Sequence, residues 1–473
     1  MPHHASEKQI HTAHWASDEF AGAALGDERR VQRLISIATD FAAQPGASIP
    51  QACGSWAQAK AAYRFFDNDA IEPEQMLAAH AQATRERMRG EAVVLCAQDT
   101  TYLNYSAHPQ TEGLGPIGNN RDKPIGLLLH STLALTAQGQ ALGVMHAAIT
   151  ARSRRRFGTS SAQRNRLKLA AKESQKWLQS YQACQQCAAD CPATMVVNVA
   201  DREGDLYELF AAALAPTDGA RVHVLVRAQH NRAVDHPQHD LWDLLGAQRV
   251  SARLQVHVPG RKPGTPARVA TLTIRLTAVT LQPPCLKEDQ PPLTLWAVEA
   301  RETRPPRGVA PVCWRLLTTL PVETAEQALE KVRWYAQRWQ IEVMHKILKS
   351  GCRLEQRQLE TAARLRRVAI VDLIVAWRVL ALTKAARETP QAPASAWLEP
   401  HQWRALVCYM QKRSQPPSIP PALCQAVRWI AQLGGFLARR RDGAPGPVVL
   451  WRGLQQLRAI TDAWIRFRHA KSG

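Results

Sequence analysis

The chain has 473 residues, of which 45% are hydrophobic and 21% are charged. This length exceeds what one hydrophobic core usually holds, so two or three domains are expected, and the composition excludes a disulfide-stapled scaffold or a wholly disordered chain. Lys and Arg number 60 and Asp and Glu 40, which leaves a formal net charge of +20. Such an excess favours a polyanionic partner, with nucleic acid ahead of an anionic membrane surface.

Neither export nor membrane insertion is predicted. The N-terminal segment contains no apolar run of signal-peptide length, which indicates a cytoplasmic protein. The most apolar stretch begins at Val368, but Asp372 and Arg378 interrupt it. Because charged groups are costly in hydrocarbon, we interpret this stretch as a core helix, and we expect no membrane partner.

The ten cysteines, without a secretory signal, indicate reduced thiols. Cys184, Cys187 and Cys191 have a spacing that could hold a zinc ion. A fourth ligand is not evident nearby, so small buried apolar side chains are the favoured interpretation.

Two helices are predicted near the N-terminus. The first has Asp27 as its N-cap and apolar residues at helical spacing, namely Val31, Leu34, Ile35, Ala38 and Phe41. The second begins at Ser55. Both carry basic residues, which are Arg29, Arg30 and Arg33 in the first and Lys60 and Arg64 in the second. These basic faces favour a small DNA-binding unit, with solvated surfaces as an equally good interpretation.

The middle of the chain has an α/β pattern. Short apolar runs predict strands that end at Asp99 and at Asp201, and GLLLHSTLALTAQGQALGVMHAAI predicts a hairpin that turns at Gln138 and Gly139. A mostly polar helix is expected from about Thr159, before the second of these strands. Several further strands with Pro and Gly punctuation follow from Arg221 to about Leu320 and indicate an inserted β region.

The C-terminal part is predicted to be helical. One helix runs from near Thr324 to Ser350, and Tyr335, Arg338, Glu342 and Lys349 fall on one face of it, within an arc of roughly 60°. A second helix covers 362–387. ETPQAPAS then forms a linker, and further helical segments follow, interrupted by QPPSIPP and RRRDGAPGP.

Three carboxylates suggest metal-dependent chemistry on phosphodiesters. Asp99 and Asp201 each follow an apolar strand, and Glu342 belongs to the polar helix face. Two divalent ions about 4 Å apart need shared carboxylates, which two Asp and one Glu can supply, while nearby cations can hold phosphates. Taken singly, each aspartate is more often a strand-end turn residue, and the helix face could simply be solvated.

These residues carry a family resemblance. AQDTTYLNY, VADREGDLY and YAQRWQIEVMHKILKSG, with its Y-x2-R-x3-E-x6-K spacing, closely resemble the DDE transposases of bacterial insertion sequences, and the hairpin-forming, cut-and-paste type of transposon five in particular. LGDERR, AAYRFF, IGLLLHSTL and LGGF extend the likeness over nearly the whole chain.

The resemblance implies a fold and a domain order. The fold is α/β, with a ribonuclease H-like catalytic core, an inserted β region, and helical N- and C-terminal domains. We expect a helical DNA-binding domain at 1–80 and a catalytic domain at 81–390 with its insertion at about 228–312. A helical domain for dimerisation and DNA-end contact is expected at 391–473.

The resemblance also implies residue roles. Asp99, Asp201 and Glu342 would be the catalytic ligands of two Mg2+ ions, with Mn2+ able to substitute. Tyr335, Arg338 and Lys349 would contact transposon-end DNA. Trp314 would stack on a flipped base, with a core role at the start of a strand as its alternative, and Arg227 would lie near the active site. The cysteine cluster and the basic run Arg152, Arg154, Arg155 and Arg156 look like local additions.

The activity implied is transposition. A homodimer would pair two inverted terminal repeats in a synaptic complex, nick the DNA, form and open a hairpin, and join the ends to target DNA in the bacterial nucleoid. Two alternatives stay open. One is a catalytically inactive or inhibitory DNA-binding relative, against which the intact acids argue, and the other is a nuclease of the same fold that hydrolyses without rejoining.

Overall fold

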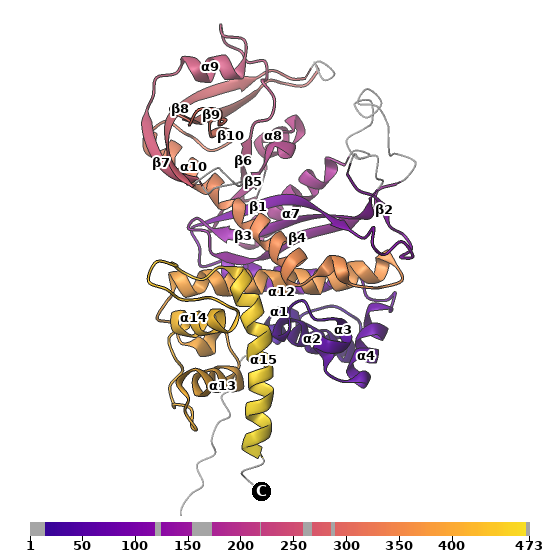
Figure 1. Ribbon diagram of the computed structural model, residues 1–473. Coiled ribbons are helices and arrows are strands. Elements are labelled where there is room, and N and C mark those ends of the chain that lie inside the picture. Colours follow the sequence, from indigo (N-terminus) through magenta and orange to yellow (C-terminus); the bar gives the residue numbers. More distant parts are fainter. Residues whose placement is uncertain are drawn as a thin grey trace, which may run out of the picture. The chain divides into compact units, whose positions relative to one another are not determined.

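A computed structural model describes residues 15–118, 124–153, 173–217, 219–258, 267–284 and 289–469 (Figure 1). The chain forms two compact units. A helical unit comprises Met1–Ala83, Leu103–Leu127 and Val343–Gly473, and a sheet unit comprises Thr84–Tyr102 and Leu128–Glu342. The N- and C-terminal segments thus belong to the same unit. The division into three domains expected from the sequence stays a prediction.

A mixed sheet of ten strands holds the middle of the chain together. Its order is β2-β3-β1-β5-β6-β10-β9-β8-β7, with β4 paired to β3. β1, β5 and β6 are parallel to one another, whereas β6–β10, β10–β9, β9–β8, β8–β7 and β3–β4 are antiparallel pairs. The strands are β1 Val93–Asn104, β2 Gly115–Pro116, β3 Ile125–Thr136, β4 Ala141–Thr150, β5 Met195–Ala200, β6 Val222–Arg227, β7 Ala252–Val258, β8 Arg268–Leu281, β9 Leu293–Glu302 and β10 Cys313–Thr318.

Helices connect and cover these strands. They are α7 Gln175–Asp190, α8 Tyr207–Leu214, α9 Leu241–Ala247, α10 Ala325–Gln337 and α11 Trp339–Lys346. The predicted start of the polar helix near Thr159 lies outside the described residues. Strands lie where the β-rich pattern from Arg221 to Leu320 predicts them, and they continue the main sheet through β10.

The predicted hairpin is confirmed. β3 and β4 pair over most of their length, and Gly139 has a φ of +92° at the turn between them, a conformation that favours glycine. β3 is buried almost throughout, and it has neighbouring strands on both edges. The polar side chains in this buried stretch, among them His130, therefore need hydrogen-bond partners within the protein.

One predicted strand boundary is wrong. β1 does not end at Asp99 but continues to Asn104. Its pairing with β5 ends at Ala97, but β3 is its neighbour on the other edge. Just after the end of β1, the Tyr105 N–H donates to the carbonyl of Ile125, the first residue of β3, at 2.9 Å. A second pairing edge thus extends the strand, and Asp99 lies inside it.

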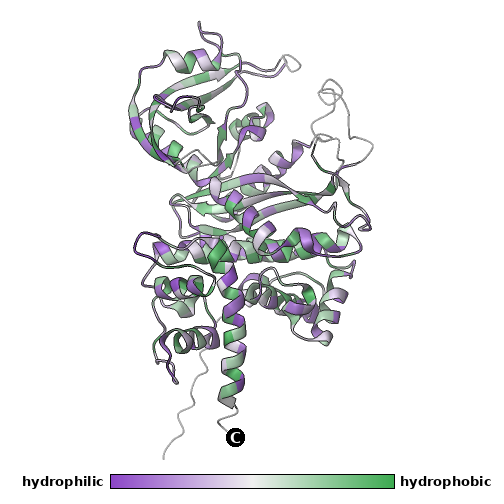
Figure 2. Ribbon diagram, in the orientation of Figure 1, coloured by the Kyte–Doolittle hydropathy of each residue, from purple (hydrophilic) through white to green (hydrophobic). Residues whose placement is uncertain are grey.

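The helical unit contains the predicted N- and C-terminal helices. They are α1 Trp15–Phe20, α2 Glu28–Ala43, α3 Ile49–Cys53, α4 Trp56–Phe66, α12 Ala362–Glu388, α13 Pro400–Gln411, α14 Leu423–Leu433 and α15 Pro447–His469, while α5 Pro73–Met88 leads into the sheet unit. Asp27 accepts a backbone hydrogen bond as the predicted N-cap, and Ser55, where the second helix is predicted to begin, is also an N-cap. α2 buries its predicted apolar stripe. The helices of this unit carry both hydrophilic and hydrophobic residues along their length (Figure 2).

α12 is a core helix, as predicted. Its carboxylate Asp372 is buried and forms an ion pair with Arg357 at 2.8 Å, while Arg378 lies 4.5 Å from the centre of the Trp15 ring. Both charged residues that interrupt the apolar stretch therefore have protein partners. None of the helices in the described parts of the chain is both long and apolar enough to span a membrane.

Candidate active site

Asp99 lies within β1, and Asp201 directly follows the neighbouring parallel strand β5. Ala97 pairs with Val199, so each aspartate follows a paired residue by two positions. Because side chains alternate along a strand, Asp99 projects from the same face as Ala97, and position 201 continues that face from β5. The sheet therefore brings together two acids that are about a hundred residues apart in sequence.

The two carboxylates influence each other. Burial raises the pKa of Asp201, and the negative charge of Asp99 raises it further. A hydrogen bond from the Glu203 N–H to Asp201 Oδ1, at 2.9 Å, opposes this effect and also caps the short 3-10 turn Arg202–Gly204. A cation bound beside Asp201 would offset both causes of its raised pKa.

The helix that carries Glu342 is not continuous. The prediction of one helix from Thr324 to Ser350 is wrong in this respect, because α10 ends at Gln337, α11 begins at Trp339, and a π-helical turn covers Ile347–Gly351. Around Arg338 the backbone bonds tighten to i→i−3, from the Arg338 N–H to the Tyr335 carbonyl and from the Ile341 N–H to the Arg338 carbonyl. The start is as predicted, with Thr324 as N-cap.

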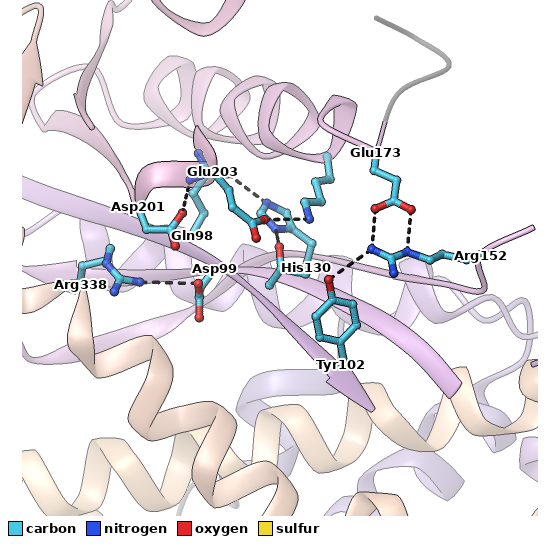
Figure 3. A network of polar contacts seen from close by, with 11 residues as sticks. Gln98, Asp99, Tyr102, His130, Arg152, Glu173, Asp201, Glu203 and Arg338 are labelled. Carbon is cyan, nitrogen blue, oxygen red and sulfur yellow. Dashed lines mark hydrogen bonds and ion pairs between the residues drawn. The ribbon is translucent and has the colours of Figure 1, made fainter. Parts of the chain in front are cut away.

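Arg338 joins two of the three acids. Its Nη1 lies 3.6 Å from Asp99 Oδ1 (Figure 3). Its Nη2 donates a hydrogen bond to Glu342. The guanidinium is largely buried, and its Nη1 has no hydrogen-bond partner among the described residues. Burial alone would lower the pKa of Arg338, but Tyr335, Asp99 and Glu342 together raise it. The positive charge beside Asp99 and Glu342 is therefore that of the Arg338 guanidinium.

Tyr335, Trp314 and Arg227 form the adjoining part of the site. The rings of Trp314 and Tyr335 meet edge to face, with centroids 5.4 Å apart, and the pKa of Tyr335 is raised by burial against the opposing charges of Arg338 and Arg227. Arg227 donates from Nη2 to the Cys313 carbonyl at 2.8 Å and so holds the start of β10. Trp314 is half-buried at this point of the strand.

The remaining predicted DNA contacts belong to the helical unit. Lys349 lies in the π-helical turn with its Nζ 3.5 Å from Glu355. Arg29, Lys60 and Arg64 are exposed on α2 and α4, whereas Arg30 donates to the Leu25 carbonyl at 2.9 Å. These side chains belong to the helical unit, whereas Asp99, Asp201 and Glu342 belong to the sheet unit.

The basic run that begins at Arg152 and the cysteine cluster look like local additions in the sequence. Arg152 forms an ion pair with Glu173 and donates to the Tyr102 hydroxyl at 3.2 Å (Figure 3). Arg154, Arg155 and Arg156 lie outside the described residues. The three cysteines of the cluster are buried on and just after α7, where Cys187 contacts Met88 and Cys191 contacts the Arg85 carbonyl.

The buried polar residues next to Asp99 were not identified from the sequence as part of the site. His130 and Gln98 are buried polar residues that form hydrogen bonds with each other, and Trp177 packs against His130. A histidine within the apolar run IGLLLHSTL was the available signal, because a buried polar group requires partners. Which residues those partners are depends on the pairing of distant strands.

No group of three or more His, Cys, Asp and Glu side chains in the described parts of the chain is close enough together to hold a metal ion. In this arrangement the guanidinium of Arg338 joins Asp99 and Glu342.

Comparisons with known proteins identify the family. A family model described as a transposase DNA-binding region matches residues 12–71, a transposase DDE domain matches 192–377, and a transposase Tn5 dimerisation domain matches 374–472. A solved structure of the piggyBac transposase synaptic complex with hairpin DNA is similar at 9% identity, with a TM-score of 0.37, over 96% of this chain and 78% of that one. That likeness by itself carries no conclusion about this chain.

The matched DDE domain includes Asp201 and Glu342, and the mixed sheet with its flanking helices is the ribonuclease H-like core expected from the sequence. DDE domains generally use divalent metal ions, and the matched regions at the two ends indicate DNA binding and formation of a homodimer. The chain belongs to the DDE transposases of the Tn5 type, enzymes that catalyse DNA cleavage and strand transfer.

Proposed function

We propose that this transposase moves DNA by a Mg2+-dependent cut-and-paste reaction that passes through a hairpin, with Asp99, Asp201 and Glu342 as its catalytic acids. The observation that supports this most is the placement of the acids around Arg338 and the edge of the parallel strands. Asp99 lies in β1 two residues after its last pairing with β5, Asp201 directly follows β5, and Arg338 contacts both Asp99 and Glu342.

The donor set fits divalent metal ions. Carboxylate oxygens are the ligands that Mg2+ prefers, and Mn2+ accepts the same donors. The raised pKa of Asp201 reflects burial and repulsion from Asp99, both of which a bound cation would offset. When bound, two such ions would supply charge neutralisation at the scissile phosphate and polarisation of the attacking oxygen.

The basic and aromatic residues beside the acids would hold the DNA end. The planar guanidinium of Arg338 can bind a phosphate through two hydrogen bonds, in exchange for its present carboxylate partners. Tyr335 and Arg227 adjoin it, and Lys349 would act as a further phosphate contact. Their contribution is positioning and charge stabilisation.

Trp314 would hold the base that leaves the stack when the hairpin forms. Stacking on an aromatic ring offsets part of the free energy of unstacking such a base. The half-buried indole is supported from the edge by Tyr335, and Arg227 holds the backbone beside it through the Cys313 carbonyl. A rigid platform of this kind suits a base that must be held during one step only.

One site can serve the whole reaction because every step is an in-line displacement at phosphorus. Water attacks first and releases a 3′ hydroxyl, and this hydroxyl attacks the opposite strand to form the hairpin. A second water opens the hairpin, and the freed 3′ ends attack target DNA. Each step forms one phosphorus–oxygen bond and breaks another, so the same positioned groups can be reused.

The remaining assignments extend this proposal to the whole chain. Residues 1–80, through Arg29, Arg30, Lys60 and Arg64, would bind the inverted terminal repeats, and 391–473 would pair two subunits in the synaptic complex. The catalytic domain would occupy 81–390, with the insertion at about 228–312. The protein would act on the nucleoid of a bacterial cytoplasm.

The test is a cleavage assay on linear duplexes that carry the inverted repeats flanking the coding region. Wild-type protein should cleave in Mg2+, whereas Asp99→Ala, Asp201→Ala and Glu342→Ala should each lose cleavage and keep most of their affinity for the ends. Asp442→Ala, at an ion pair with Arg439 in the helical unit, is the control and should cleave normally. Near-normal cleavage by any one of the three variants would refute the assignment of that residue.

A further inference from the structure

One imidazole lies behind the strand that carries Asp99. His130, on β3, is 1% exposed, with its Nδ1 2.9 Å from Thr100 Oγ1 and its Nε2 3.0 Å from Gln98 Oε1 (Figure 3). Gln98 and Thr100 are the two neighbours of Asp99 in β1. Because side chains alternate along a strand, both project from the face opposite to Asp99. His130 therefore forms hydrogen bonds with the side chains of the residues before and after the aspartate.

The direction of these hydrogen bonds follows from their continuation into β5. Asn198 donates from Nδ2 to Cys184 Sγ at 3.4 Å, and its Oδ1 accepts from Gln98 Nε2 at 2.6 Å. The Gln98 Oε1 must then accept a hydrogen bond from His130 Nε2–H. Nδ1 is left as the acceptor for the Thr100 hydroxyl. This series of hydrogen bonds thus connects β1, which carries Asp99, to β5, which leads to Asp201.

A second connection runs through Trp177 in α7. Its ring meets the His130 ring edge to face, with centroids 4.7 Å apart. Gly204, in the turn that follows Asp201, lies so near the indole that a Cβ there would be 3.2 Å from Trp177 Cε3. The turn of Asp201 therefore rests on the same tryptophan that packs against His130.

We propose that His130 is a positioning residue for the catalytic acids. It holds β1 at Asp99 through the side chains of Gln98 and Thr100, and the turn of Asp201 through Trp177, and so sets the separation of the two carboxylates. Like charges on neighbouring strands repel each other, and a rigid support behind them opposes their separation. This inference rests on the proposed role of the two aspartates as metal ligands.

The test uses the full-length protein and two measurements. Binding of Mn2+ alone is followed by electron paramagnetic resonance without DNA, and the single-turnover rate constant of nicking is measured at saturating DNA and Mg2+. Loss of a side chain that supports metal ligands typically lowers metal affinity or activity by about 10- to 100-fold. His130→Phe and Thr100→Val should therefore show losses of about tenfold or more in both measurements. Their affinity for end DNA should stay near the wild-type value.

The chain offers matched variants. Thr100→Ser keeps the hydroxyl that His130 accepts from, so it should restore nicking and Mn2+ binding. Thr132 lies on the same strand and face as His130, but its buried hydroxyl bonds to Ser180 in α7. Thr132→Val therefore removes a buried hydrogen bond of the same unit without touching β1, and it should lower the melting temperature while sparing both measurements.

The outcomes separate the inference from the proposal on which it rests. If Asp99→Ala loses Mn2+ binding while Thr100→Val and His130→Phe behave as wild type, the positioning role is wrong and the ligand assignment stands. If Thr132→Val loses as much nicking and Mn2+ binding as Thr100→Val, the network is merely structural and the inference fails. If Asp99→Ala binds Mn2+ like wild type, the ligand assignment itself fails.

Discussion

Replacing Trp314 with alanine should separate hairpin formation from first-strand nicking. The indole is half-buried at the start of β10, with its ring edge-to-face with Tyr335 at 5.4 Å and 65°. The backbone around it is held independently, by pairing with β9 and by the bond from Arg227 to the Cys313 carbonyl. Trp314→Ala therefore removes the ring and leaves the strand in place.

The expected magnitude follows from the lost stacking. Base stacking on an aromatic ring contributes about 1–3 kcal/mol, which corresponds to hairpin formation slowed by roughly one to two orders of magnitude. Nicking should be affected much less, because the base is still stacked in the duplex at that step. The lost ring pair with Tyr335 contributes about 0.5–1.5 kcal/mol to stability, so a small fall in melting temperature is expected.

The assay is a gel time course that resolves nicked, hairpin and double-strand-break products. A second substrate replaces the flipped nucleotide with an abasic site. Because the variant and the abasic substrate delete the same contact, their defects should overlap and not add. Trp242→Ala is the matched control, since Trp242 is also half-buried in the sheet unit and stacks on Arg315 at 4.2 Å.

Two results would refute the reasoning. Equal loss of nicking and hairpin formation, with a clearly lowered melting temperature, would identify Trp314 as a core residue. Additive defects of the variant and the abasic substrate would mean that the ring and the base do not contact each other. Either result would leave the catalytic acids unaffected, because those are tested separately.

Three further predictions concern stability and DNA binding. Asp372→Ala should lower the free energy of unfolding by about 3–5 kcal/mol in a denaturant titration, because it leaves the Arg357 charge buried without its partner. Asp462→Ala, at a partly exposed ion pair, should lower it by no more than about 1 kcal/mol. Equal losses in the two variants would contradict this prediction. Burial, with help from Arg221, lowers the pKa of His223 below 6.5, so the unfolded chain takes up the proton first as the pH falls. Acidification from about pH 7.5 to 5 should therefore lower the melting temperature less in His223→Asn than in wild type. Affinity for end DNA should fall linearly with salt on logarithmic axes, with a slope that counts the neutralised phosphates, and a flat response would argue against a phosphate-dominated interface.

Much of the local structure could be read from the sequence. The N-cap Asp27, the helix starts at Ser55 and Thr324, the hairpin turn at Gly139 and the strand before Asp201 all lie where predicted. These features depend on hydrogen bonds and periodicity within a few neighbouring residues, so a short window of sequence contains the information. The spacing of the Tyr-Arg-Glu-Lys motif likewise indicated the family that the comparisons confirm.

The arrangement of the candidate site was decided by contacts between distant segments. β1 continues past Asp99 because β3 provides a second edge, the helix tightens at Arg338 where the guanidinium reaches Asp99 and Glu342, and His130 finds its partners on two other elements. None of these follows from periodicity, because a helical pattern specifies which face is polar and not where the backbone will deviate. Sequence alone therefore determined the family and most elements and supplied the hypothesis of the three acids, while tertiary packing decided how those side chains are held and which cation they meet.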